Sequence, residues 1–537
     1  MDCFLVRVNK RYVFIIGVLI RGMINLTPRE YQRAIFECAR ECNTLVVLPT
    51  GLGKTLVAVM LSVERLEKYP RSKVVILAPT RPLVEQHLQT FRRELPELFA
   101  DMQLFTGSVH AEKRRDLFDT TDIIFSTPQC IAHDVSAGLY SLSDVSLLVV
   151  DEAHRCLKNY DYTVVVDFYK RQARQQRILG LTASPGHDAE NVREICHHLN
   201  IEEIEVRTRD SDDVRDYLQR LEFEKIEVPF PDEFLELKVL LKRLWDARID
   251  RLKQHKFLFG VANKITLLQL QQRLALRARQ GDYGAMHGMS TTAQAIKIAH
   301  ALELLETQTL SGLGEYLKGL VAQAREKKSR GVQQLVKSPE FGAAMISLQR
   351  LRATKMEHPK IEALAAVLLE QFSKKNDSKV IIFSQFRETA LKILERVSQL
   401  EGIHAATFFG QANRVQAGLS QKEQRAIIER FREGEINVLC ATSIGEEGLD
   451  IPEVSTVVFY EPIPSAIRKI QRAGRTARLA PGRLVILVTQ DTRDVAHHYA
   501  SRARERKMYQ TLALVREELK NRRKELTLNE FGAVERT

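Results

Sequence analysis

The sequence predicts an α/β fold of two parallel-sheet lobes with an all-helical domain inserted between them. Residues 26–184 and 355–489 each alternate apolar runs of strand length with amphipathic helical segments. That alternation is typical of a parallel sheet covered by helices on both faces. Within residues 234–352, apolar residues instead recur at spacings of three and four, which indicates a helical bundle.

The chain of 537 residues is long enough for several domains that each bury a core. We expect an N-terminal extension at 1–25, a first lobe at 26–230, a basic helical insert at 231–353, a second lobe at 354–492 and a helical tail at 493–537. In the extension, the apolar run 12–20 is too short to span a bilayer and lacks a small-residue cleavage site after it. An extra strand, or an upstream start codon ahead of Met23, explains this run better than export.

The first strand of lobe 1 leads into a loop whose glycines are suited to bind phosphates. The loop comprises Pro49, Thr50, Gly51, Leu52 and Gly53, and the next helix begins near Lys54 and Thr55. The two glycines let backbone N–H groups turn inward where a Cβ would meet a phosphate, and the helix points its positive N-terminal end at the anion. Lys54 can reach the β- and γ-phosphates, and the Thr55 hydroxyl can bind Mg²⁺. These features predict an ATP site.

Six strands are expected between residues 26 and 184, and polar clusters follow them. The six strands are Thr44–Pro49, Val74–Ala78, Gln103–Thr106, Asp122–Ser126, Leu147–Asp151 and Ile178–Thr182. Two short strand-like pieces are expected beyond them, at Glu202–Val206 and Lys225–Val228. Ligands of parallel sheets bind at the carboxyl ends of the strands, so these clusters should share one edge with the phosphate loop.

The acidic pair Asp151-Glu152 follows a buried strand and suggests the chemistry of that edge. Asp151 can hold Mg²⁺ through its water shell, and Glu152 can orient and deprotonate the attacking water. Acidic residues at a strand end often only cap the next helix. The phosphate loop earlier in the chain favours the role in metal binding and base catalysis.

Five motifs make the chain resemble superfamily 2 helicases of the DEAH-box type. Gly53-Lys54-Thr55, Asp151-Glu152-Ala153-His154 and Thr182-Ala183-Ser184 are similar to motifs I, II and III. Ala441–Pro452 and Gln471–Arg478 are similar to motifs V and VI, and all five occur in the family's order. The resemblance implies two RecA-like lobes with ATP and Mg²⁺ bound at the cleft between them.

The resemblance also implies roles for residues outside the phosphate loop. Arg29, Tyr31 and Gln32 sit where the family reads adenine, Gly448 and Asp450 would contact the nucleotide, and Gln471 would sense the γ-phosphate. His154, Thr182 and Ser184 would couple the ATP site to nucleic acid. The implied nucleic-acid contacts are Thr80, Arg81, Thr106, Gly107, Thr127, Pro128 and Thr442.

The second lobe is expected to lack a phosphate loop of its own and to complete the ATP site from across the cleft. Its strands are predicted at Lys379–Phe383, Ala405–Phe409, Asn437–Ala441, Thr456–Tyr460 and Leu484–Val488. Arg475 and Arg478 are three residues apart, so on a helix both guanidinium groups could reach a γ-phosphate and stabilise transition-state charge. Ala477 replaces a glycine that many relatives carry here, but it leaves both arginines in place.

The insert carries the net charge of the chain. Between Lys238 and Arg352 there are 20 Lys and Arg against 8 Asp and Glu, and this excess equals the whole formal charge of +12. An excess of one sign favours a polyanion-binding role over an ordinary solvated face. Only Phe257, Phe259 and Tyr283 lie among the basic residues, so stacking on bases is not the obvious mode of binding nucleic acid.

The helices of the insert are predicted at Phe234–Lys256, Asn263–Arg279, Thr291–Gln308, Gly314–Lys327 and Phe341–Arg352, with breaks at Gly281–Gly288 and Ser311–Gly314.

The position of the insert narrows the resemblance to one branch. Ala295–Thr307 and His358-Pro359-Lys360 resemble the archaeal Hef and Fanconi anaemia group M helicases, which act on forked and branched DNA. The RIG-I and Dicer group carries its insert at the same point of the chain and acts on double-stranded RNA.

Hef proteins can carry a C-terminal nuclease domain, and no acidic nuclease cluster follows Thr489. Two explanations fit this observation: a member of the Hef group that has only the helicase part, or a chain from which the nuclease domain has been cut. The tail is expected to be a charged helix that packs on the second lobe.

The seven cysteines form no C-x-x-C pair, so neither a disulfide framework nor a zinc site is suggested, and a reducing compartment fits. Cys38 and Cys42 are expected to be small buried residues. We therefore expect a cytoplasmic, nucleoid-associated enzyme with no membrane role.

Our leading hypothesis is an ATP-dependent 3′-to-5′ helicase or translocase for forked, branched or duplex DNA. Single-stranded DNA and replication or repair proteins are further expected partners. Two alternatives stay open: an ATPase that depends on double-stranded RNA, and a non-motor scaffold for branched nucleic acid.

Overall fold

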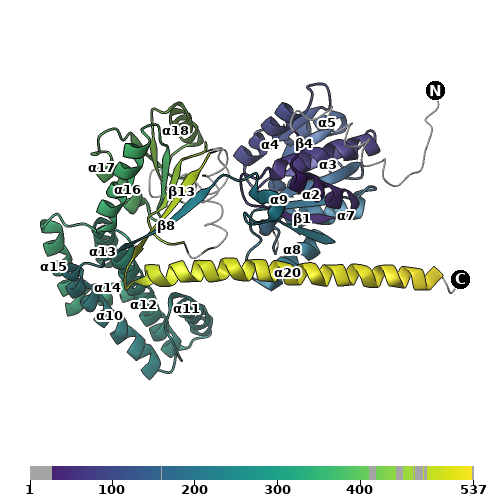
Figure 1. Ribbon diagram of the computed structural model, residues 1–537. Helices are drawn as coiled ribbons and strands as arrows, with labels where there is room; N and C mark the ends of the chain where they lie inside the picture. Colours follow the sequence, from purple (N-terminus) through teal and green to yellow (C-terminus); the bar gives the residue numbers. More distant parts are fainter. Residues whose placement is uncertain are drawn as a thin grey trace, which may run out of the picture.

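The computed structural model describes residues 27–158, 160–410, 419–442, 451–463, 465, 476 and 480–534. Two parallel sheets lie side by side, a helical domain lies beside the second sheet, and one long helix runs past all three parts (Figure 1). The predicted fold class is therefore confirmed.

Lobe 1 contains a seven-stranded sheet in the order β3-β4-β2-β5-β6-β1-β7, with every described pair parallel. The strands are β1 (Thr44–Val47), β2 (Lys73–Leu77), β3 (Met102–Phe105), β4 (Ile123–Ser126), β5 (Val145–Asp151), β6 (Ile178–Thr182) and β7 (Glu203–Val206). The strand boundaries lie within two residues of the predicted ones, because these short apolar runs are buried on both faces.

Helices cover both faces of this sheet and enclose two hydrophobic cores, one on each side. They are α2 (Glu30–Glu41), α3 (Lys54–Lys68), α4 (Arg81–Glu94), α5 (Ala111–Thr120), α6 (Pro128–Ser136), α7 (Asp161–Gln172), α8 (Ala189–His198) and the short α9 (Asp212–Arg215). Several of these helices begin directly after a strand, so their N-termini lie at the carboxyl edge of the sheet.

Lobe 2 contains a six-stranded parallel sheet in the order β10-β11-β9-β12-β13-β8. Its strands are β8 (Leu221–Val228), β9 (Val380–Phe383), β10 (Ala405–Phe408), β11 (Val438–Ala441), β12 (Thr456–Phe459) and β13 (Gly482–Thr489), and its helices are α16 (Lys360–Lys374), α17 (Arg387–Val397) and α18 (Gln421–Glu433).

Strand β8 differs from expectation, since the range 26–230 placed it in lobe 1. All eight of its residues pair with β13, so the chain crosses to the second sheet before it enters the insert (Figure 1). The half-polar sequence of β8 fits an edge strand and gave no sign of which sheet it joins.

The insert is a bundle with its own core. Its helices are α10 (Leu235–Gln254), α11 (Lys264–Arg279), α12 (Tyr283–Thr307), α13 (Leu310–Arg325), α14 (Arg330–Val336) and α15 (Pro339–Ala353). The predicted breaks at Gly281–Gly288 and Ser311–Gly314 are largely wrong, because α12 and α13 run through most of these glycines. A Cβ on Gly288 would lie 2.9 Å from the Phe257 ring, and one on Gly314 would lie 2.7 Å from an Arg352 nitrogen. These glycines permit close packing of neighbouring segments. The sequence reading also missed α14.

A buried polar junction joins the insert to lobe 2. The Lys360 ammonium group pairs with Asp494 and donates to the Thr307 carbonyl 3.1 Å away, and both charged side chains are fully buried. Glu357 accepts from the Leu310 and Ser311 amides at the start of α13. His358, buried beside them, accepts from the Lys360 amide.

The tail forms helix α20 (Arg493–Val534), which was expected to pack on lobe 2. Its first residues do contact β13 and α12, but the helix then crosses to lobe 1 and packs on α8 and β7 (Figure 1). Met508, Leu512 and Val515 are buried in a lobe 1 core. The expectation missed this because the apolar residues are sparse in a highly charged helix.

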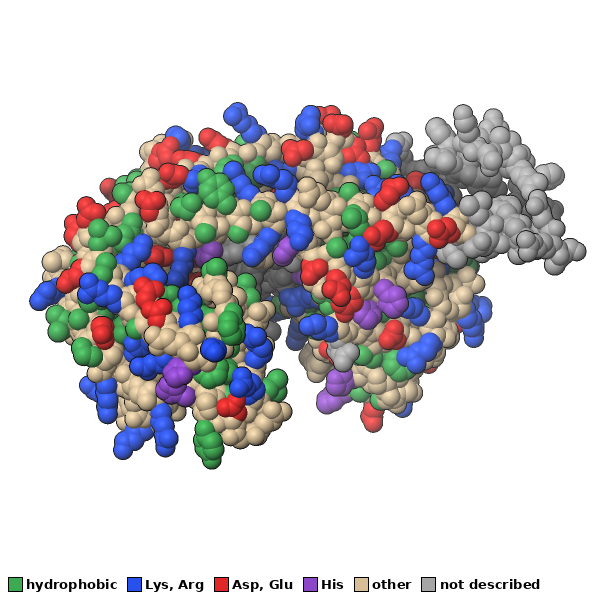
Figure 2. All heavy atoms as spheres, turned by 90° about the horizontal axis from the view of Figure 1, so that it is seen from below, with side chains coloured by type: hydrophobic (Ala, Val, Ile, Leu, Met, Phe, Trp, Pro, Cys, Tyr) green, Lys and Arg blue, Asp and Glu red, His purple; other side chains and the backbone are tan. Residues whose placement is uncertain are grey.

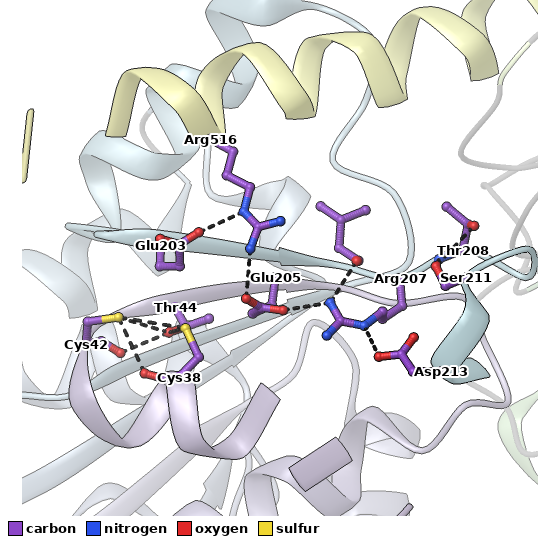
Figure 3. A network of polar contacts seen from close by, with 11 residues as sticks. Cys38, Cys42, Thr44, Glu203, Glu205, Arg207, Thr208, Ser211, Asp213 and Arg516 are labelled. Atoms are coloured by element: carbon purple, nitrogen blue, oxygen red, sulfur yellow. Dashed lines mark hydrogen bonds and ion pairs between the residues drawn. The ribbon is translucent and has the colours of Figure 1, made fainter. Parts of the chain in front are cut away.

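Figure 3 shows the polar side of that contact. Arg516 of α20 binds Glu203 and Glu205 of β7 at 2.8 and 3.0 Å. Next to it, the sulfur atoms of Cys38 and Cys42 lie 4.0 Å apart. Cys42 is buried and Cys38 is partly buried. Among the described residues, no helix has the length and apolar character needed to cross a bilayer.

Candidate functional site

The loop between β1 and α3 has the geometry of a phosphate cradle. Gly51 and Gly53 have φ angles of +89° and +73°, in the left-handed region that favours glycine. Lys54 begins α3, and its ammonium group donates to the Leu48 carbonyl at 2.9 Å, so the side chain lies along the loop. The Thr50 hydroxyl is buried without a hydrogen-bond partner in the described chain. A triphosphate would supply acceptors for these donors, so the loop fits ATP.

Side chains of helix α2 hold the backbone of this loop in place. The Tyr31 hydroxyl donates to the Leu52 carbonyl at 2.8 Å, and the Gln32 amide donates to the same oxygen at 3.1 Å. A Cβ on Gly53 would lie 2.5 Å from the Gln32 amide nitrogen, so only glycine allows this approach. The Gln32 carbonyl in turn accepts from the Arg29 amide at 2.9 Å. The predicted adenine-reading residues therefore adjoin the cradle.

Asp151 ends β5 and lies buried near the phosphate loop. Its Oδ2 is 2.7 Å from His87 Nε2, and its backbone carbonyl accepts from the Tyr162 hydroxyl at 2.7 Å. Burial acts to raise the pKa of Asp151, but His87 and then Lys54 lower it by more, so the pKa lies below its usual range. The carboxylate is therefore ionised at neutral pH, as a ligand of Mg²⁺ must be. Thr55 and Asp151 alone make a partial site, which is usual for Mg²⁺ bound together with a nucleotide.

Glu152 has a strained backbone, with φ +52° in the left-handed region. Its Oε2 lies 3.2 Å from His154 Nδ1 and has no aligned hydrogen bond among the described residues. That carboxylate oxygen is buried beside His154 and keeps an unused acceptor position, as a general base requires.

The predicted coupling residues are hydrogen-bonded to each other. His154 Nδ1 and Thr182 Oγ1 are 3.2 Å apart, and Thr182 Oγ1 accepts from the Ser184 amide at 3.2 Å. The Ser184 hydroxyl lies 2.8 Å from the Met508 sulfur of α20. The end of β5 is thus joined through the end of β6 to the helix that arrives from lobe 2.

The predicted nucleic-acid residues of lobe 1 share one edge, because β3, β4 and β2 are neighbours in the sheet. Thr80 and Thr127 are the N-cap residues of α4 and α6, and Arg81 and Pro128 begin those helices. Thr106 and Gly107 follow β3, with open space around the Gly107 Cα. Helix N-termini are suited to bind phosphates. Thr442 follows β11 in lobe 2 and is buried.

Part of the predicted site lies outside the described residues, namely Gly448, Asp450, Gln471, Arg475 and Arg478. Between the two arginines, Thr476 is described. It is buried, and its hydroxyl donates to the Val454 carbonyl at 2.7 Å.

Two partners of this site were missed by the sequence reading. His87 was not singled out, although Val84, His87, Leu88 and Phe91 share the buried face of α4 and a polar residue there needs a partner. Glu85 on the same helix accepts from Arg81 at 2.7 Å and from Arg425 of α18 at 2.6 Å, which links the two lobes. No local sequence signal marks that long-range pair.

Lys and Arg side chains lie at the surface of the insert. Figure 2 views the molecule from below and shows many of them, with apolar side chains among them. Several cations pair locally, such as Lys242 with Asp246 and Lys264 with Glu303.

Comparison with known proteins agrees with this geometry. Three family models match: "DEAD/DEAH box helicase" over residues 29–192, "Putative ATP-dependent RNA helicase, helical bundle" over 233–355 and "Helicase conserved C-terminal domain" over 359–480. The fold, the site and these matches therefore define the class of the chain as a superfamily 2 helicase.

The comparisons also identify the branch of superfamily 2 to which the chain belongs. The crystal structure of the Pyrococcus furiosus Hef helicase domain matches with a TM-score of 0.68 and 41% identity, covering 88% of this chain and 98% of that one. The Fanconi anemia group M protein homolog of Mus musculus is 31% identical over 91% of this chain and 26% of its own length. The DNA helicase fml1 of Schizosaccharomyces pombe is 31% identical over 87% of this chain and 57% of its own. The chain belongs to the Hef and Fanconi anaemia group M family. It covers between 25% and 61% of the length of each curated relative that it matches here.

Proposed function

We propose that the chain is an ATP-dependent DNA helicase or translocase that acts on forked or branched DNA, with 3′-to-5′ polarity. The observation that carries the proposal is an arrangement within lobe 1. The phosphate cradle, the Asp151-Glu152 pair and the predicted strand contacts all lie at the carboxyl ends of strands of one sheet. ATP and a nucleic-acid strand can therefore bind one rigid body at the same time.

The side chains divide the hydrolysis of ATP between them. Lys54 would bind the β- and γ-phosphates, Thr55 and Asp151 would hold Mg²⁺, and Glu152 would take the proton from the attacking water. When bound, Mg²⁺ neutralises charge on the phosphate oxygens. Arg475 and Arg478, on lobe 2, would stabilise the charge that develops on the γ-phosphate.

DNA is favoured over RNA by the resemblance to Hef and by relatives named as DNA helicases, such as fml1 and the Neurospora crassa mph1. Some printed names favour RNA, including the helical-bundle model and the Arabidopsis thaliana relative called an RNA helicase. The nucleic-acid class is therefore the first thing to test. A role near the nucleoid, with replication or repair proteins as partners, follows if DNA is the substrate.

The deciding experiment measures ATP hydrolysis with single-stranded DNA, blunt duplex DNA, forked DNA and duplex RNA. We expect forked DNA to stimulate hydrolysis most. Greater stimulation by duplex RNA would favour the RIG-I and Dicer type of activity. Slow hydrolysis that no polymer changes would instead indicate a scaffold.

The Lys54→Ala variant tests the cradle. Losing the ammonium group at the phosphates should reduce DNA-stimulated hydrolysis by at least about a thousandfold while DNA binding stays close to that of the unaltered chain. Lys68→Ala, at the far end of the same helix, is the matched control. Retained turnover in Lys54→Ala would refute the assigned role.

A further inference from the structure

Two cysteine side chains lie together at the edge of lobe 1, near the contact with α20. The sulfur atoms of Cys38 and Cys42 are 4.0 Å apart, and each lies 3.7 Å from the Thr44 hydroxyl oxygen (Figure 3). Among the six cysteines that the structure describes, this is the one case in which two thiols are within hydrogen-bond distance. The pair is therefore a possible site of chemistry that the ATP site does not use.

The backbone places the two thiols at a separation that a disulfide can bridge. Cys38 lies in the last turn of α2, and Cys42 is its C-cap residue, whose amide donates to the Cys38 carbonyl at 3.2 Å. Residues four apart in a helix have Cα atoms about 6.2 Å apart. Disulfides join Cα atoms that are about 4.4–6.8 Å apart. Side-chain rotation can therefore bring the sulfurs from 4.0 Å to the bonding distance of about 2 Å.

The reactivity of this pair differs from that of the buried cysteines. Burial raises the pKa of Cys156, Cys196 and Cys440 to about 12, so these thiols stay protonated and unreactive. In the pair, the hydrogen bond from Cys38 lowers the pKa of Cys42 to about 7, against the effect of burial. The same hydrogen bond raises the pKa of Cys38, which keeps the proton. Two sulfurs that share one proton supply a thiolate at neutral pH.

Solvent reaches the two sulfurs unequally. Cys38 is partly exposed, whereas Cys42 is 2% exposed. An oxidant in solution therefore meets Cys38 first, and Cys42 lies behind it in contact with its sulfur. This arrangement has one thiol that reacts with the oxidant and a second thiol that completes the reaction.

We propose that Cys38 and Cys42 form a reversible oxidation site, at which a small-molecule disulfide such as oxidised glutathione converts the two thiols into one disulfide within the chain. The site is separate from the phosphate cradle and does not depend on the proposed function. Its reaction needs no group from the insert or from lobe 2.

The reaction consists of two successive thiol–disulfide exchanges. Cys38 passes its proton to Cys42 and attacks one sulfur of the oxidant, which forms a mixed disulfide on Cys38 and releases a small thiolate. The released thiolate takes the proton from Cys42. The Cys42 sulfur then attacks the Cys38 sulfur and releases the second small thiolate. The two protein sulfurs lose two electrons as they join, and the oxidant disulfide gains them.

The bond would restrain the joint between two elements that hold the phosphate loop. Strand β1 begins at Thr44 and leads into the loop, and Tyr31, about two turns before Cys38 on α2, donates to the Leu52 carbonyl at 2.8 Å. A disulfide between residues 38 and 42 closes a short ring and lowers the conformational entropy of the unfolded chain. We therefore expect oxidation to stabilise lobe 1.

The test treats the full chain with oxidised glutathione, blocks the remaining thiols and digests the protein with trypsin in the absence of reductant. Trypsin cuts after Arg40, between the two cysteines, and so gives separate peptides 34–40 and 41–54. We expect mass spectrometry to find these two peptides joined by a disulfide in most of the protein, which should still migrate as a single chain on a non-reducing gel. Dithiothreitol should separate the peptides again.

Two controls distinguish this reaction from general thiol oxidation. Cys130 is partly buried like Cys38, but its sulfur accepts a hydrogen bond from Thr127 and contacts no second thiol among the described residues. It should carry a glutathione adduct at most, and the pair should lose its free thiols at least about tenfold faster than Cys130 does. In Cys42→Ser the second step is lost, so the glutathione adduct on Cys38 should accumulate.

The melting temperature measures the restraint on α2. We expect the oxidised chain to melt about 4 °C above the reduced chain. Cys42→Ser should melt at the same temperature before and after treatment with oxidised glutathione.

Three results would overturn the proposal: thiols of the pair that stay free, a glutathione adduct that persists on Cys38 of the unaltered chain, or a linkage found only between two chains. Joined peptides without a rise in melting temperature would confirm the oxidation site and refute the restraint on α2. Loss of DNA-stimulated hydrolysis in the reduced chain would instead contradict the proposed function and leave this site unaffected.

Discussion

The joint between the insert and lobe 2 differs in kind from the contact between the two lobes. At the joint, Lys360 and Asp494 pair with both side chains fully buried, and Thr389 donates to Gln308 at 2.9 Å. Between α4 and α18, Arg425 reaches Glu85 through an ion pair that is open to solvent. A buried pair is costly to break, whereas an exposed pair contributes little. The insert is therefore expected to move with lobe 2 as one body, while the surfaces of the two lobes that meet at α4 and α18 can separate.

The largest effect should come from breaking the buried joint. Lys360→Met removes one partner and leaves Asp494 charged and buried, so we expect the free energy of unfolding to fall by about 4 kcal/mol. Urea denaturation measures it. Lys374→Met, which breaks an exposed pair with Glu370, should cost less than about 0.5 kcal/mol. Similar losses in the two variants would contradict the distinction.

A second variant tests the attachment of α20 to lobe 1. Leu512→Ala empties part of a lobe 1 core and should lower the free energy of unfolding by about 3 kcal/mol. Leu514→Ala, at a half-exposed position on the same helix, provides the comparison. Equal stability of the two variants would show that α20 does not pack on lobe 1 in solution.

Acid should weaken the joint through His358. Burial, with a contribution from Lys360, lowers the pKa of His358 to about 3. The unfolded chain takes up this proton near pH 6.5, so the stabilising contribution is complete above that pH and is lost as the pH falls toward 3. Denaturation at pH 7.5 and pH 5 should show a loss of about 2 kcal/mol that is absent in His358→Gln. His404→Gln, an exposed histidine of lobe 2, should keep the loss.

The smallest effect is expected at the contact between the lobes. Glu85→Gln should change the free energy of unfolding by less than about 0.5 kcal/mol, because the pair is exposed. It should instead broaden the distribution of distances between dyes placed on α5 and α17, measured by single-molecule energy transfer. Glu97→Gln serves as the control. An unchanged distribution would mean that the ion pair does not restrain the lobes.

The sequence predicted what is encoded locally. The buried strands of residues 26–184 and 355–489, the phosphate cradle and the order of the motifs could be predicted, because buried apolar runs and glycine turns are local signals. His358-Pro359-Lys360 was noticed only as a resemblance. Its place in the joint depends on Asp494, 134 residues further along the chain. The partner sheet of β8, the pairing of His87 with Asp151 and the path of α20 depend likewise on distant parts of the chain.

Helix α20 also sets a limit on how the lobes can move. Asp494 fixes its start in the joint, and Met508 fixes it on lobe 1 beside Ser184, so about 21 Å of helix connects the two anchors. A helix cannot stretch without losing its hydrogen bonds. As long as both anchors hold, the lobes can pivot about this rod, but they cannot draw apart along it.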